Sequence, residues 1–213
     1  MHHPASIISK AAHGSWVMDK ALSTDSDPIL KLQGVGWVTR KGISMATITI
    51  RIKSSSEMDH ESQADVNRLD IEQTLSAVLP GSTETRILNW TERKQKDPLF
   101  GILRGRSRLV GGTRDDDGIV RPAIEIESTL TDEKAKSVIR DFLRDFTTAA
   151  SHDNLSDLYM HDYVRSEKAG WTVEQTWGIS SVDSQEALVR RVVLVKDNTH
   201  ETAVVVYRNT FSS

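Results

Sequence analysis

Apolar and polar residues alternate along most of this chain with the two-residue period of β-strands. In residues 46–53, Ile48, Ile50 and Ile52 lie on one face of the expected strand, and polar side chains lie on the other. Similar patterns occur at residues 69–75, 84–91, 100–110, 123–128, 171–177, 187–195 and 202–208, with turn residues between them. The chain is therefore predicted to be mainly β, with mostly antiparallel strands.

Two stretches depart from this pattern and predict helices. In residues 27–45, Pro28 suits a first helical turn, and Gly34 and Gly36 interrupt the short helical run. In residues 132–146, apolar side chains recur three and four positions apart, which is typical of one amphipathic helix.

Two further stretches are predicted to be loops. Residues 54–67 are rich in serine and acidic side chains, which favours an extended hairpin loop. Residues 147–168 are polar and lack clear periodicity, although Tyr159, His161 and Tyr163 lie close together there. We expect an ordered loop in this second stretch.

Size and charge limit the possible functions. A chain of 213 residues fits one domain. The formal charge of -3 gives no general attraction to nucleic acid, and no apolar run approaches the length of a membrane span. The first residues lack the pattern of a secretory signal, so a cytoplasmic protein is expected.

Metal and cofactor motifs are also missing from the sequence. There are no cysteines, and the seven histidines are scattered without ligand spacing. No glycine-rich loop follows a strand and opens a helix, as a phosphate-binding loop would. We therefore predict neither a metal site nor a cofactor.

Motifs at both ends of the chain resemble one known family. Near the start, Gly14-Ser15-Trp16 precedes Gly34-Val35-Gly36-Trp37-Val38-Thr39-Arg40. Near the end, Gln175-Thr176-Trp177 is followed by Leu188-Val189-Arg190 and then by Tyr207. This order resembles the intracellular fatty-acid-binding proteins, a branch of the calycin (lipocalin-like) β-barrels.

The resemblance implies a definite architecture. Residues 1–213 would form a single antiparallel up-and-down barrel around a small-molecule cavity. Residues 27–45 would form its short helical lid. Residues 111–168 would be an insertion that carries the added helix at 132–146.

The resemblance also implies ligand-binding residues. Arg190 and Tyr207 would hold the polar or anionic end of a hydrophobic ligand, because a guanidinium and a phenol both donate hydrogen bonds. Gln175 would be a further neutral partner, and Trp37 on the lid would touch the ligand. Val205 stands where the family has a second arginine, so a ketone, enol, phenol or amide oxygen fits at least as well as a carboxylate.

Simpler interpretations of the two main site residues remain open. Arg190 would need no ligand if it paired with Glu72, Glu84 or Glu174, because a buried charge must be paired in any case. Tyr207 would need none if it were an ordinary amphipathic core residue.

A middle segment suggests chemistry that the family does not predict. Glu84, Arg86, Leu88 and Trp90 would share one face of a strand, so a carboxylate, a guanidinium and an indole would line the same wall. Glu84 and Arg86 are therefore candidate catalytic residues. The alternative is a salt bridge on the outer face of the barrel.

Three functions are compatible with these observations. The first is the binding of a small hydrophobic molecule. The second is a cofactor-independent isomerase or cyclase of a natural-product pathway that uses the same cavity. The third is an interaction domain whose barrel is filled by its own side chains. The sequence does not predict the ligand or the oligomeric state.

Overall fold

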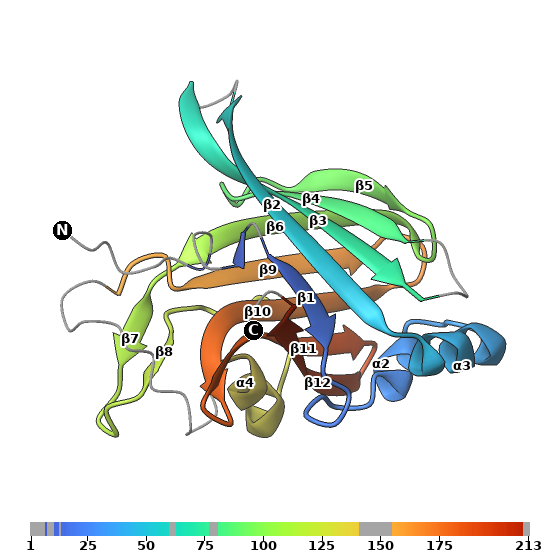
Figure 1. Cartoon of the computed structure of the whole chain (residues 1–213). Coiled ribbons are helices and arrows are strands. Elements are labelled where there is room, and N and C mark those ends of the chain that lie inside the picture. Colours follow the sequence, from blue (N-terminus) through green and yellow to red (C-terminus); the bar gives the residue numbers. More distant parts are fainter. Residues whose placement is uncertain are drawn as a thin grey trace.

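The computed structural model describes residues 7, 11–12, 14–59, 63–76, 81–140 and 155–210. Most of them form one antiparallel sheet of ten strands in the order β4-β3-β2-β1-β12-β11-β10-β9-β6-β5, which curls into a nearly closed barrel (Figure 1). The strands are β1 (Ser15–Met18), β2 (Ile48–Asp59), β3 (Ala64–Leu75), β4 (Ser82–Ile87), β5 (Arg93–Asp97), β6 (Gly101–Val110), β9 (Tyr159–Ser166), β10 (Trp171–Val182), β11 (Gln185–Lys196) and β12 (Thr199–Asn209). This confirms the predicted calycin-type barrel.

The two ends of the sheet are joined by an isolated bridge just beyond the end of β4. Asn89 forms an isolated antiparallel bridge with Arg108 of β6, and the Trp90 N–H donates to the Ser107 carbonyl at 2.8 Å. Trp90 has a φ of 61°, an uncommon backbone conformation for a bulky side chain. The strand predicted at 84–91 therefore ends at Ile87.

Strand alternation separates an apolar interior from a charged exterior. Ile50 and Ile52 of β2 are buried in the interior, in a cluster that also contains Trp16 and Trp177. Arg51, between the two isoleucines, is exposed. This two-residue alternation is the signal by which the sequence predicted the strands.

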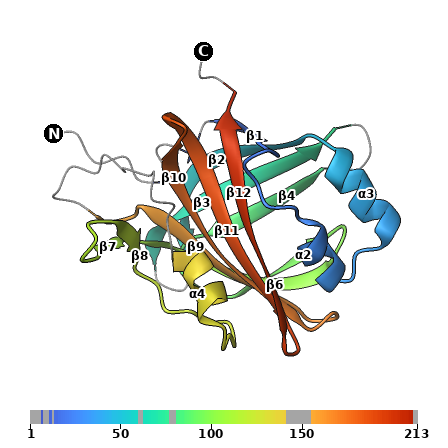
Figure 2. The ribbon, with the colours of Figure 1, turned by 90° about the horizontal axis from the view of Figure 1, so that it is seen from below.

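Two short helices lie together at one end of the barrel (Figure 2). They are α2 (Asp27–Leu32) and α3 (Trp37–Met45). Gly34 has a φ of 87°, which allows the tight turn between them. Arg40 Nε donates to Asp27 Oδ1 at 2.9 Å and ties the second helix to the first. The helices predicted within 27–45 are thus present.

A separate layer covers part of the outer face of the sheet. It includes β7 (Gly112–Arg114), β8 (Val120–Pro122) and α4 (Glu133–Arg140), which packs against β10, β11 and β12. Ile139 of α4 is fully buried in a cluster with Tyr159 and Val193. The helix predicted at 132–146 is present in its first half, and residues 141–146 lie outside the described residues.

Three segments differ from the prediction. Residues 54–67 largely continue β2 and β3 as a long hairpin, with Ser56 paired to Asn67 (Figure 1). Within 147–168, residues 159–166 form β9, a central strand that pairs with both β6 and β10. Residues 123–128 are irregular, because the Glu127 and Ser128 N–H groups donate to the Glu174 side chain rather than to a neighbouring strand.

Candidate functional site

A cavity of about 400 Å³ lies between the α2–α3 pair and the strands of the barrel. Much of its wall is apolar and comes from elements distant in sequence. Ile29 and Ile43 line it from the two helices, Phe100 lines it from the turn before β6, and Val192 and Ala203 line it from β11 and β12. Volume and composition are those of a site for a small hydrophobic molecule.

Several polar side chains reach the same cavity. Among the described residues that line it, Glu84, Asp97 and Arg190 are charged, and Tyr207 adds a phenol. The Asp97 carboxylate accepts the Leu99 N–H at 2.7 Å and so shapes the turn after β5. An apolar wall with a few convergent polar groups can orient a ligand as well as enclose it.

Arg190 is held from two sides. Its Nε donates to Gln175 Oε1 at 2.6 Å, and its guanidinium lies 4.8 Å from the centre of the Trp177 ring. The registers place Trp177 and Val205 directly opposite Arg190 on the flanking strands. Gln175, predicted as a further partner of the ligand, thus contacts Arg190, but it is 1% exposed and is not among the residues that line the cavity.

Tyr207 lines the same cavity as Arg190, has a hydrogen bond with it and is almost fully buried. Burial raises the pKa of the Tyr207 phenol, and the nearby Glu84 charge raises it further, whereas the charge of Arg190 and its hydrogen bond lower it. The net shift is upward, so the phenol keeps its proton at neutral pH and can donate a hydrogen bond. Arg190 and Tyr207 therefore form a pair of donors at one point of the cavity.

Asp162 lies behind this pair and was not found from the sequence. It is on β9 and is 0% exposed. Its Oδ2 accepts Gln175 Nε2 at 3.2 Å and Trp177 Nε1 at 3.0 Å. Because Gln175 donates its amide nitrogen to Asp162, it presents its amide oxygen to Arg190. In the sequence Asp162 lies between His161 and Tyr163, in a segment without alternation, so no signal there marked it as an inward-facing residue.

Glu84 and Arg86 point inward, so the alternative of an outer-face salt bridge does not apply. Arg86 Nη2 lies 2.5 Å from Glu84 Oε2, and Arg86 Nε lies 3.7 Å from Asp162 Oδ2. Burial alone would lower the pKa of Arg86, but the charges of Glu84 and Asp162 raise it, and the net shift is upward. Arg86 is therefore a buried cation between two carboxylates, while Glu84 reaches the cavity.

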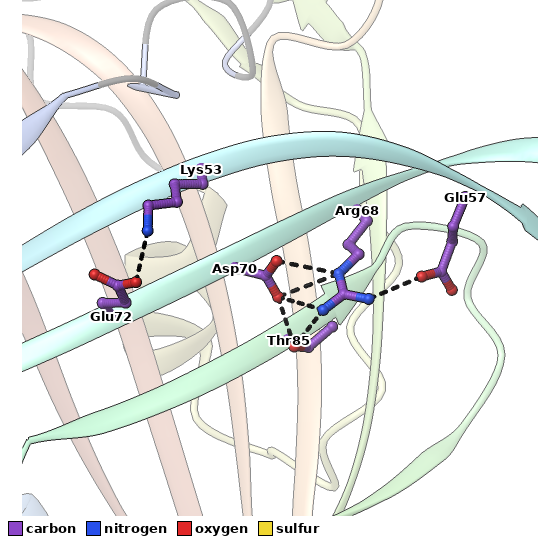
Figure 3. Close-up of polar contacts among 6 residues, drawn as sticks. All are labelled: Lys53, Glu57, Arg68, Asp70, Glu72 and Thr85. Carbon is purple, nitrogen blue, oxygen red and sulfur yellow. Dashed lines mark hydrogen bonds and ion pairs between the residues drawn. The ribbon is translucent and has the colours of Figure 1, made fainter.

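Two of the alternative partners for Arg190 are occupied elsewhere. Glu72 accepts Lys53 Nζ at 2.8 Å on the outer wall, in the same region as the Arg68–Asp70 ion pair (Figure 3). Glu174 accepts His161 Nε2 at 2.8 Å under the covering layer.

The two remaining aromatic candidates lie away from the cavity. Trp37, at the start of α3, is 63% exposed and is not among the residues that line the cavity. Trp90 stacks on His161 with ring centres 4.8 Å apart. The face predicted to carry Glu84, Arg86, Leu88 and Trp90 therefore does not extend to Trp90.

The sheet order, the near closure of the sheet and the helix pair at one end give a barrel fold like that of the fatty-acid-binding proteins. Among solved structures, the chain is similar to As-p18, an extracellular fatty acid binding protein, with a TM-score of 0.51 and 11% identity over 98% of this chain and 100% of that one. A fatty-acid-binding protein from Manduca sexta gives a TM-score of 0.48 and 10% identity over 93% and 98% of the two chains. At this level of identity, the similarity shows the fold alone.

Two proteins with similar sequences are described as pericyclases. The chain is 30% identical over 108 residues to pericyclase pydY of Acremonium sp, which is 51% of this chain and 56% of that protein. It is 29% identical over 105 residues to the probable pericyclase scpY of Mollisia scopiformis, covering 49% and 53%. The matches thus span about half the length of these relatives. No protein-family model matches the chain.

The cytoplasmic location expected from the sequence stays a prediction. Within the described part of the chain, no helix has the length and apolar character needed to cross a bilayer.

Proposed function

We propose that this protein binds a small hydrophobic molecule inside the barrel, with the polar end of that molecule at Arg190 and Tyr207. The observation that carries the proposal is the cavity of about 400 Å³, whose largely apolar wall includes Arg190 and Tyr207. The fold shared with As-p18 is consistent with it. Gln175 keeps Arg190 in place, and the α2–α3 pair acts as the lid.

The binding proposal is tested with Nile red, an uncharged dye whose fluorescence rises in apolar surroundings. We expect saturable binding of one dye molecule per chain. Native mass spectrometry of protein purified from its own host adds a second measurement, because a retained molecule would reveal its mass. A chain that takes up no dye and carries no molecule would contradict the proposal.

We propose as a second function that the bound molecule is rearranged in the cavity without a cofactor. The specific observation in favour is the similarity to two proteins described as pericyclases. A pericyclic isomerisation moves electron pairs around a ring within one molecule, so atoms and electrons balance without an added reagent. The protein must only fold the substrate into the reactive shape and polarise it.

Three side chains have the chemistry for this task. Arg190 and the neutral Tyr207 would donate hydrogen bonds to a substrate oxygen and withdraw electron density from the reacting system. The Glu84 carboxylate, fixed by Arg86 at 2.5 Å, would accept a hydrogen bond or stabilise a developing positive charge.

The enzymatic proposal predicts a separation of binding from turnover. Glu84→Gln keeps the size of the side chain and removes its charge, so it should abolish turnover of a polyene substrate while the substrate still binds. Glu72→Gln on the outer wall is the matched control. Product formation is followed by liquid chromatography with mass detection. Full activity of the Glu84→Gln variant would remove Glu84 from the catalytic step.

A further inference from the structure

Negative charge outweighs positive charge in and directly behind the cavity wall. Three carboxylates are present in the described part of this wall, from Glu84, Asp97 and Asp162. They face two guanidiniums, Arg190 at the cavity and Arg86 behind it. Carboxylates thus outnumber guanidiniums by three to two in the described part of this wall.

The contacts of Arg86 strengthen this imbalance. Arg86 is 6% exposed and lies between Glu84 and Asp162, so its charge is used within the protein. Arg190 donates from Nε to the neutral amide of Gln175, but it shares the cavity with Glu84 and Asp97.

A second buried guanidinium would be needed to reverse the balance. The position opposite Arg190 on β12 is Val205, which contributes an apolar surface to the cavity instead. Glu84 lines the same cavity as Arg190 and Tyr207, so its negative charge lies near the donor pair. A ligand carboxylate held by Arg190 and Tyr207 would thus experience repulsion from nearby carboxylates of the wall.

We infer that the cavity selects a ligand whose polar end is an uncharged hydrogen-bond acceptor, such as a ketone or amide carbonyl, and discriminates against a carboxylate. This inference rests on the proposed binding function and specifies its ligand class. Arg190 and Tyr207 both donate, and a neutral carbonyl oxygen has two lone pairs to accept from them. A neutral head group of this kind carries no charge that Glu84 and Asp97 would repel.

The test compares two ligands that differ only in the head group. Dodecanamide and dodecanoate compete with Nile red for the wild-type protein at mildly alkaline pH, where the acid is ionised. We expect dodecanamide to bind roughly tenfold more tightly, or better, because it avoids the repulsion between like charges. Equal affinity, tighter binding of dodecanoate, or failure of dodecanamide to compete would overturn the inference.

Charge-removing variants test the cause of the selectivity. Glu84→Gln should raise the affinity ratio of dodecanoate to dodecanamide by roughly tenfold. Asp97→Asn should shift the ratio in the same direction and serves as the second variant if the first does not fold, since Asn keeps the oxygen that accepts the Leu99 N–H. Glu72→Gln, which removes an outer-wall carboxylate, should leave the ratio unchanged.

The outcomes separate this inference from the function on which it rests. If Nile red does not bind to the wild-type protein, the cavity is not a binding site and both proposals fail. If Nile red binds and dodecanoate competes as well as dodecanamide, the binding function stands and the inference alone is wrong. If the ratio stays the same in both cavity variants, the wall carboxylates do not determine it, which also contradicts the inference.

Discussion

Replacing Arg190 by methionine tests the anchor of the proposed site. The change keeps an unbranched side chain of similar length but removes the guanidinium. A hydrogen bond from a charged group contributes about 1.5–3 kcal/mol, so the affinity for dodecanamide should fall roughly 10- to 150-fold.

The same substitution also affects the fold, and the structure gives the size of that effect. Gln175 Oε1 loses its partner at 2.6 Å, and Trp177 loses a guanidinium 4.8 Å from its ring. An unpaired buried acceptor costs about 1–3 kcal/mol, and a cation–π contact contributes about 0.5–2 kcal/mol. Apolar contacts of the methionine side chain with the wall offset part of this loss. We therefore expect the free energy of unfolding to fall by about 1–3 kcal/mol.

The assay combines Nile red competition with urea unfolding of the same preparations. Arg51→Met is the matched control, because Arg51 is exposed on the outer face of β2. Arg51→Met should change neither the binding free energy of dodecanamide nor the free energy of unfolding by more than about 0.5 kcal/mol. A folded Arg190→Met protein that binds dodecanamide within about twofold of wild type would show that Arg190 is not the anchor.

Two further predictions concern buried carboxylates. Asp162→Asn should lower the free energy of unfolding by about 2–4 kcal/mol in urea titrations, because it leaves Arg86 with one carboxylate partner. The control, Asp70→Asn on the outer wall, should lower it by at most about 1 kcal/mol. Equal effects of the two substitutions would contradict the role of Asp162. Burial would raise the pKa of Glu174, but bonds from His161 and two backbone N–H groups lower it below 4.5 overall. The ionised Glu174 side chain therefore stabilises the fold above about pH 4.5, and this stabilisation is lost as the pH falls through the lower pKa that Glu174 has in the folded protein. Urea unfolding should therefore show a smaller loss of stability in acid for Glu174→Gln than for wild type. Identical acid profiles would refute this.

Strand periodicity predicted most of the barrel because apolar side chains recur at every second position, where they face the interior. It failed for β9, where Tyr159, Met160, His161 and Asp162 are all buried. The covering layer buries the outer face of this strand, so no alternation remains in the sequence. The reverse error arose at 123–128, where apolar and polar residues alternate along an irregular segment that lies over Glu174.

The candidate site was predictable only in part for a related reason. Arg190, Tyr207 and Gln175 belong to motifs whose order resembles a known family, and the structure brings them together. Asp162 and Asp97 belong to no such motif, and their importance comes from distant partners such as Trp177. Trp37 follows the motif, but its position at the start of α3 leaves it exposed.

Whether the barrel encloses a binding cavity can be decided by filling that cavity. Ala203 is buried and lines the cavity from β12, so Ala203→Trp should place an indole inside it. Its neighbour Thr202 lies on the other face of the strand, and Thr202→Trp is the control. Nile red titration should show one saturable site in wild type and in Thr202→Trp, and none in a folded Ala203→Trp protein. Unchanged uptake by Ala203→Trp would mean that the dye binds elsewhere and that the barrel interior is not the binding site.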